Sequence, residues 1–139
     1  MAVLLQRVGR RGAALLFFFL LDAMWAFALL NPPDPITPSY SWPATIAPLW
    51  VWAIAWTLVG LACLVFAFLR HDTAAFTAAV SIKVLWGGTL GLGWATGQVE
   101  RGYVIAVIWL AFAAFVYLIA GGIPAPPPRP VKARLWKRS

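Results

Sequence analysis

The sequence predicts an all-α integral membrane protein: a four-helix bundle with up-down-up-down topology and both termini in the cytoplasm. Three observations predict it. Apolar residues make up 63% of the 139-residue chain and charged residues 11%, whereas an ordinary soluble chain is roughly 45–50% apolar. The apolar residues gather in four long runs, and lysine and arginine gather outside these runs.

Each apolar run is long enough to cross a bilayer as a helix. We expect helices over residues 13–30, 49–69, 73–96 and 102–122, which together form one transmembrane domain over residues 1–122. About 20 residues are needed to cross a hydrocarbon core of ~30 Å. A helix satisfies its backbone hydrogen bonds within one segment, and none of the runs shows the alternation typical of barrel strands.

The first run, residues 13–30, is interrupted only by Asp22. The arginines before it and the sequence Ala26-Phe27-Ala28 also imitate a secretory signal with its cleavage site. A carboxylate inside the apolar part of such a signal is unfavourable, so we favour a retained first helix and keep the cleaved signal as the alternative.

The connections between the runs differ in character. Residues 31–48 contain six prolines and are predicted to form an extended or turning loop without a helix. Residues 70–72 form a tight turn, in which Asp72 is expected to cap the next helix. Residues 97–101 make the last connection. Such short connections force the helices that they join to run antiparallel.

Basic residues predict the orientation. Nine of the eleven lie in the N-terminal segment, the 70–72 turn and the C-terminal segment, and a four-span chain places all three on one side, which the positive-inside rule makes cytoplasmic. Residues 123–139 are predicted to be a cytoplasmic tail, proline-rich at first and then basic. No basic groove for nucleic acid can form across segments that lie in lipid. Cations near the membrane are expected to contact anionic lipid headgroups, namely Arg7, Arg10, Arg11, Lys132, Arg134, Lys137 and Arg138.

Aromatic residues gather where the second helix is expected to enter from outside. Amphipathic rings favour the headgroup region, so they predict an outer aromatic belt. A carbohydrate-binding platform built from two of them, Tyr40 and Trp42, is the alternative. The set is Tyr40, Trp42, Trp50, Trp52, Trp94 and Tyr103.

Asp22 and Lys83 are the only charged residues inside the runs. Counted from the cytoplasmic ends of their helices, both lie roughly 14–15 Å deep at 1.5 Å per residue. Because an unpaired charge at that depth costs at least ~2.5–3.5 kcal/mol, we expect an intramembrane polar pair between the first and third runs. The pair either fixes which helices pack together, or lines a polar path that changes during gating.

The third run is rich in glycine. Gly87 with Gly91, and Gly93 with Gly97, have the G-x-x-x-G spacing that allows close approach of helix backbones. Lys83, Gly87 and Gly91 share roughly one face. We expect these glycines to pack helices, either within the bundle or between copies of the chain.

Groups for catalysis or metal binding are scarce. His71 and Cys63 are each the only residue of their kind, so no metal-ligand cluster or internal disulfide can be assembled. Ser81 and Lys83 are two positions apart and do not face one another on a helix. The sequence therefore predicts no catalytic residues, no cofactor and no enzymatic activity.

Several short segments between Trp42 and Ala120 resemble small four-span membrane proteins of tailed phages of actinobacteria. The segments are IAPLWVW at 46–52, FLR at 68–70, KVLW at 83–86, RGY at 101–103 and VIW at 107–109. The resemblance implies a multi-pass protein of a bacterial cytoplasmic membrane. It also implies a holin-like function: a protein that oligomerises and permeabilises the host membrane. The alternatives are a structural or accessory subunit of a membrane complex, and a small ion- or proton-conducting protein.

Overall fold

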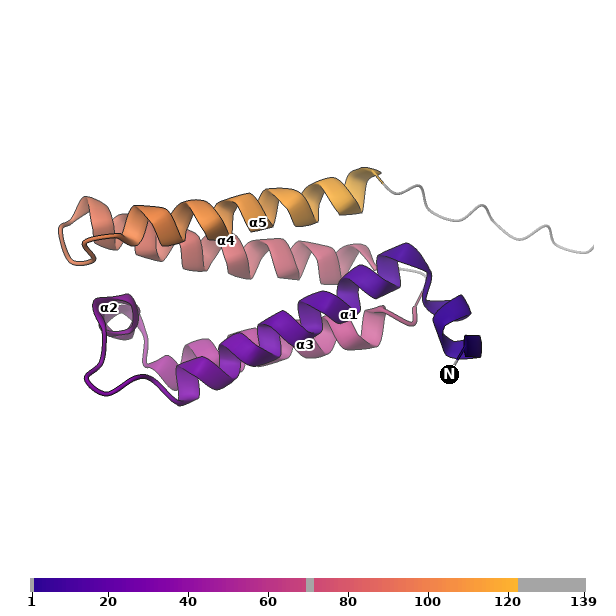
Figure 1. The fold of residues 1–139 in the computed structure, drawn as a ribbon, viewed down its shortest axis with the longest axis horizontal. Coiled ribbons are helices and arrows are strands. Elements are labelled where there is room, and N and C mark those ends of the chain that lie inside the picture. The colour runs from indigo at the N-terminus through magenta and orange to yellow at the C-terminus, as the bar shows by residue number, and fades with distance from the viewer. Residues whose placement is uncertain (1, 70–71, 123–139) are drawn as a thin grey trace, which may run out of the picture.

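The computed structural model describes residues 2–69 and 72–122, and over these residues it is all-α, with five helices and no strand (Figure 1). Three segments are long and apolar enough to cross a membrane: Arg11–Leu30 within α1, all of α3 and all of α4. A shorter apolar segment, Gly102–Leu118, lies in α5. The helices are α1 (Ala2–Leu30), α2 (Pro38–Ile46), α3 (Leu49–Phe66), α4 (Thr73–Ala95) and α5 (Gly102–Gly122).

The helix bounds differ from the predicted ones mainly at the start. α1 begins at Ala2 rather than near residue 13, because residues 2–12 contain no proline and are mostly good helix formers, arginine included. α3 ends at Phe66 rather than 69. Beyond it, the amides of Phe68 and Leu69 donate to carbonyls three residues back, which is the tightened turn common at helix ends.

The prediction of a helix-free connection over residues 31–48 is wrong, because Pro38–Ile46 forms α2. Pro38 lies in the first helical turn, where a missing N–H is no loss. Pro43 lies inside the helix and removes one amide donor, but its carbonyl accepts bonds from the Ala47 amide at 3.1 Å and from the Trp52 indole at 3.1 Å. The Trp42 indole donates to the Thr89 carbonyl at 2.8 Å. Tertiary contacts thus offset the proline penalty.

The long helices form two closely packed pairs, α1 with α3 and α4 with α5, while α1 and α4 make few close backbone contacts. Figure 1 shows the pairs side by side, with α2 lying across one end of the molecule. We call this end, which also carries the α4–α5 connection, the α2 end. The opposite end carries the connection between α3 and α4.

Two groups of buried side chains fill the space between the helices. Near the α2 end they are mainly indoles, and we call this group the tryptophan cluster: Trp25, Trp52, Trp56, Trp86 and Trp109. Toward the opposite end they are aliphatic and phenyl groups, and we call this group the phenylalanine cluster: Leu15, Phe18, Cys63, Phe76, Ala79 and Val116.

The outward faces of the helices are apolar. Met24 and Phe27 on α1 and Tyr117 and Leu118 on α5 are each about 70% exposed. Large exposed apolar surfaces are rare on soluble monomers, whereas hydrocarbon accepts them without penalty. Together with the three span-length helices, this surface identifies a membrane protein.

Candidate functional site: a buried ion pair between the helix pairs

The structure brings Asp22 of α1 and Lys83 of α4 together. Lys83 Nζ donates to Asp22 Oδ1 at 2.7 Å, and neither side chain is exposed at all. The pair joins α1 to α4, two helices that otherwise make few backbone contacts. An ion pair without water contact is stable only if both partners stay in place, because removing one strands the other charge.

Aromatic rings surround the ammonium group of Lys83. Its Nζ lies 5.5 Å from the centroid of the Phe18 ring and 5.3 Å from the centroid of the Trp56 ring. Both distances fall within the ~6 Å range in which ring faces attract cations. One charged hydrogen bond and two ring faces thus replace the water that Lys83 loses on burial.

Asp22 is accommodated by a glycine on the neighbouring helix. A methyl group at position 60 of α3 would lie 3.3 Å from Asp22 Cβ and 3.5 Å from the Phe19 carbonyl oxygen. Gly60 thus lets α3 approach α1 where the carboxylate is buried. Only one carboxylate oxygen is bonded: among the described residues, Asp22 Oδ2 has no hydrogen-bond partner.

Three indole nitrogens close to the pair are also without a hydrogen-bond partner within the described segments: Nε1 of Trp25, Trp56 and Trp86. The three rings contact one another, with centroids 5.7–6.3 Å apart and largely edge-to-face. Sequence analysis missed this group. A signal was present, since Trp25 follows Asp22 and Trp86 follows Lys83 by three residues, a spacing that puts each indole on the same helix face as the charge.

A second ion pair joins the same two helices nearer the opposite end. Arg11 Nε and Nη2 each donate to one Asp72 carboxylate oxygen at 2.7 Å, and the guanidinium lies 5.1 Å from the centroid of the Phe76 ring. Sequence analysis assigned Arg11 to lipid headgroups and the Asp72 side chain to capping α4. Asp72 does stand at the N-cap position, but its side chain makes no capping bond, because a bidentate arginine takes both of its oxygens.

The two pairs share one register. In both, the partners lie 61 residues apart in the sequence, so eleven residues separate Arg11 from Asp22 on α1 and Asp72 from Lys83 on α4. Eleven residues are close to three helical turns, which returns side chains to the same face. α1 and α4 therefore run in the same direction, with complementary charges facing each other at two levels.

The remaining predicted headgroup contacts stay predictions. Arg7 and Arg10 belong to α1. Lys132, Arg134, Lys137 and Arg138 lie outside the described residues.

Two of the four predicted packing glycines lie against α5. A methyl group at Gly87 would lie 3.1 Å from Trp109 Cβ and 3.2 Å from the Ala106 carbonyl oxygen, and one at Gly91 would lie 3.5 Å from Ala106 Cβ. The close approach that sequence analysis expected occurs within the chain. This face is therefore covered, and the alternative of self-association through it is not supported.

The other two glycines have different tasks. A methyl group at Gly93 would lie 2.6 Å from Trp42 Cδ1, so Gly93 makes room for α2. Gly97 is not a helix-packing residue, because it lies beyond the end of α4 with φ +73°. Its amide donates to the Trp94 carbonyl and the Gln98 amide donates to the Gly93 carbonyl, the two bonds of a Schellman motif.

The predicted aromatic belt divides into exposed and inward-facing members. Trp50, Trp94 and Tyr103 are about half exposed, as rings at a membrane interface would be. Trp42 and Trp52 donate their indole N–H groups to carbonyls inside the molecule.

Tyr40 also turns inward. Its ring stacks on Trp25 at 6.3 Å with an interplanar angle of 22°. Since Trp42 is occupied by the Thr89 carbonyl, the alternative of an exposed carbohydrate platform formed by Tyr40 and Trp42 is wrong.

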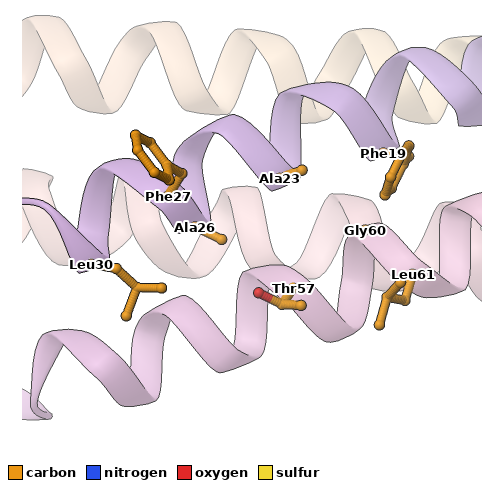
Figure 2. Close-up of a pocket in the computed structure, with 8 residues that line it drawn as sticks. All are labelled: Phe19, Ala23, Ala26, Phe27, Leu30, Thr57, Gly60 and Leu61. Atoms are coloured by element: carbon orange, nitrogen blue, oxygen red, sulfur yellow. The ribbon is translucent and has the colours of Figure 1, made fainter.

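A shallow apolar groove of about 240 Å³ runs between α1 and α3, as Figure 2 shows. Its one polar side chain, Thr57, donates its hydroxyl to the Ala53 carbonyl at 2.8 Å, so the groove presents no free donor. Sequence analysis did not identify it. The lining residues are Phe19, Ala23, Ala26, Phe27, Leu30, Thr57, Gly60 and Leu61.

Over residues 2–69 and 72–122 the structure contains no group of three or more side chains that could hold a metal ion. Cys63 is a free, buried thiol in the phenylalanine cluster. The chemistry of the interior therefore centres on Asp22, Lys83 and the tryptophan cluster.

Comparison of the chain with protein-family models, curated proteins and solved structures finds no match.

Proposed function

We propose that this chain is a four-span bundle of a bacterial cytoplasmic membrane, with both termini in the cytoplasm, which permeabilises that membrane in the manner of a phage holin. The fourth span would be α5, which packs along α4 and runs to Gly122. With four spans, all three segments rich in basic residues lie on one side and can contact anionic headgroups. The short segments similar to phage four-span proteins support the holin-like function.

The observation that carries the proposal is the fully buried Asp22–Lys83 pair between two helix pairs. α1/α3 and α4/α5 are each closely packed internally, while α1 meets α4 through few backbone contacts. The boundary between the pairs is therefore the surface along which the molecule can open at least cost in helix packing.

Opening along this boundary would admit water. Separating Asp22 from Lys83 leaves two charges near the middle of the membrane, where hydrocarbon solvates neither. The separated charges are stable only if hydrated, so the open state must contain a polar path, whereas the closed state presents a neutral core. The pair thus supplies two states with opposite permeability.

A lesion in the membrane requires several copies. The glycine face of α4 is covered by α5, so assembly would use an outward apolar surface instead. The groove between α1 and α3 is such a surface.

The test is inducible expression in bacteria with a potential-sensitive dye. We expect the wild-type protein to depolarise the membrane and arrest growth. Glu100→Gln, which removes an exposed charge in the α4–α5 connection, is the matched control and should act like wild type. Intact potential and growth, at a membrane level of protein verified by quantitative blotting, would reject the proposal.

The groove between α1 and α3 also favours a second candidate, an accessory subunit of a larger membrane complex. In that case a partner helix would cover Ala23 and Gly60. Purification in mild detergent would recover a partner in fixed ratio, and Gly60→Leu would release it. Gly88→Leu would not, because nothing lies within 4 Å of a methyl group added at position 88.

A further inference from the structure

Unpartnered polar atoms are distributed unevenly in the core. Within residues 2–69 and 72–122, the buried side-chain nitrogens and oxygens without a hydrogen-bond partner are Asp22 Oδ2 and Nε1 of Trp25, Trp56 and Trp86. All four belong to the ion pair or to the tryptophan cluster. The phenylalanine cluster contributes none of them.

These atoms form one connected region. The Trp56 ring lies 5.3 Å from Lys83 Nζ, and the rings of Trp25 and Trp86 lie 6.2 Å and 6.3 Å from the Trp56 ring. One acceptor and three donors are therefore gathered within a few ångströms of a buried charge pair.

We propose that this region is a water-binding site: water enters from the α2 end, is bound by Asp22 Oδ2 and the indole N–H groups, and stops at the phenylalanine cluster. Water suits the site because it can donate to a carboxylate and accept from an indole at the same time. A buried water requires two to four polar partners, and Asp22 Oδ2 with any one of the three indoles supplies that minimum.

Asp22 Oδ2 is the atom that makes the case. An indole N–H can be partly satisfied by the face of a neighbouring ring, and edge-to-face tryptophan pairs are present here. A carboxylate oxygen has no such substitute, and leaving it without a donor carries the full desolvation penalty. A donor other than the surrounding side chains must therefore meet its charge.

The two ends of the core differ in what they offer water. At the α2 end, Tyr40 is only partly buried and stacks on Trp25, and α2 is held by the two indole-to-carbonyl bonds of Trp42 and Trp52. Toward the opposite end, Phe18, Phe76 and Val116 are at most 2% exposed. Apolar cavities stay dry, so this cluster should close the path.

A one-sided hydrated site would give the Asp22–Lys83 pair access to protons and small polar solutes from the α2 side alone. The inference does not depend on membrane permeabilisation. It concerns the closed bundle and holds whether or not the protein forms lesions, because hydration is measured in purified protein without any pore activity.

The experiment uses cysteines at two fully buried alanines, Ala53 in the tryptophan cluster and Ala79 in the phenylalanine cluster. Ala53→Cys and Ala79→Cys are each combined with Cys63→Ala, placed in lipid nanodiscs and treated with methyl methanethiosulfonate. Because only the thiolate reacts and thiolates form in hydrated surroundings, we expect position 53 to react at least about tenfold faster than position 79. Native Cys63 in the unsubstituted chain should be as slow as position 79.

A second measurement covers variants that fail to fold. In the unsubstituted protein labelled with 15N-tryptophan, the indole protons of Trp25, Trp56 and Trp86 should exchange with deuterated water faster than that of Trp52, which is bonded to the Pro43 carbonyl. Equal thiol rates at positions 53 and 79, or exchange at the three indoles no faster than at Trp52, would overturn the proposal.

Discussion

Gly60 of α3 lies directly against Asp22 of α1: a methyl group at position 60 would come within 3.3 Å of Asp22 Cβ. The glycine and the buried carboxylate therefore depend on each other. The helices can approach because one residue has no side chain, and the approach keeps the other out of lipid.

Substitution of Gly60 should destabilise the bundle in proportion to side-chain size. Gly60→Ala requires a shift of a few tenths of an ångström, and Gly60→Val should cost about 1–3 kcal/mol because it overpacks the contact. Gly88→Ala is the control, since nothing lies within 4 Å of a methyl group there. Unfolding by sodium dodecyl sulfate in mixed micelles measures the difference. Equal losses at positions 60 and 88 would contradict the argument.

Breaking the buried ion pair on one side should be worse than removing it. Asp22→Asn leaves Lys83 charged and without its carboxylate, so we expect a loss of roughly 3–5 kcal/mol. The double variant Asp22→Asn with Lys83→Met should recover much of that loss, because no unpaired charge remains. A double-mutant cycle on the free energy of unfolding tests this, and strictly additive losses would show that the two residues do not act as a pair.

The second ion pair should contribute less and should respond to salt. The Arg11 and Asp72 side chains are 18% and 12% exposed, so water and ions reach them. We expect Asp72→Asn to cost about 1 kcal/mol and the loss to shrink as salt is raised from about 0.01 to 1 M. The Asp22–Lys83 contribution should stay constant over the same range. Equal salt dependence of both pairs would be inconsistent with their different burial.

Gly97 should resist replacement for a conformational reason. Its φ of +73° is a left-handed conformation that costs other residues about 1–2 kcal/mol. Gly97→Ala should therefore lower stability by about 1 kcal/mol, although nothing lies within 4 Å of the added methyl group. Gly97→Asn should be milder, since asparagine tolerates this conformation better. Thermal unfolding midpoints in detergent would rank the variants.

Sequence analysis predicted the elements with long periodic signals. The four apolar runs became helices because length and hydropathy are properties of each segment alone. Asp22 and Lys83 could be related through their depth, which again depends only on position within a run. α2 was missed because the proline rule is local, whereas Trp42 and Trp52 stabilise that helix from positions outside its backbone ladder.

Partner choice was harder to predict, because it depends on which helix faces which. Gly87 and Gly91 have a spacing that permits close packing but does not name the partner, and the partner is α5. Asp72 has the residue type of a helix cap, and only the fold reveals that Arg11 takes its carboxylate. The equal eleven-residue spacing of opposite charges on α1 and α4 was the one available signal for that pairing.

That spacing has a consequence for how the chain assembles. On α1 the cation precedes the anion, and on α4 the anion precedes the cation, so the two helices match in a single parallel alignment. Sliding one helix by a turn, or inverting it, would leave Asp22 and Lys83 facing apolar groups in a solvent that cannot accept them. Insertion errors are thus penalised at two levels at once, and the four charges proofread the order in which the helices come together.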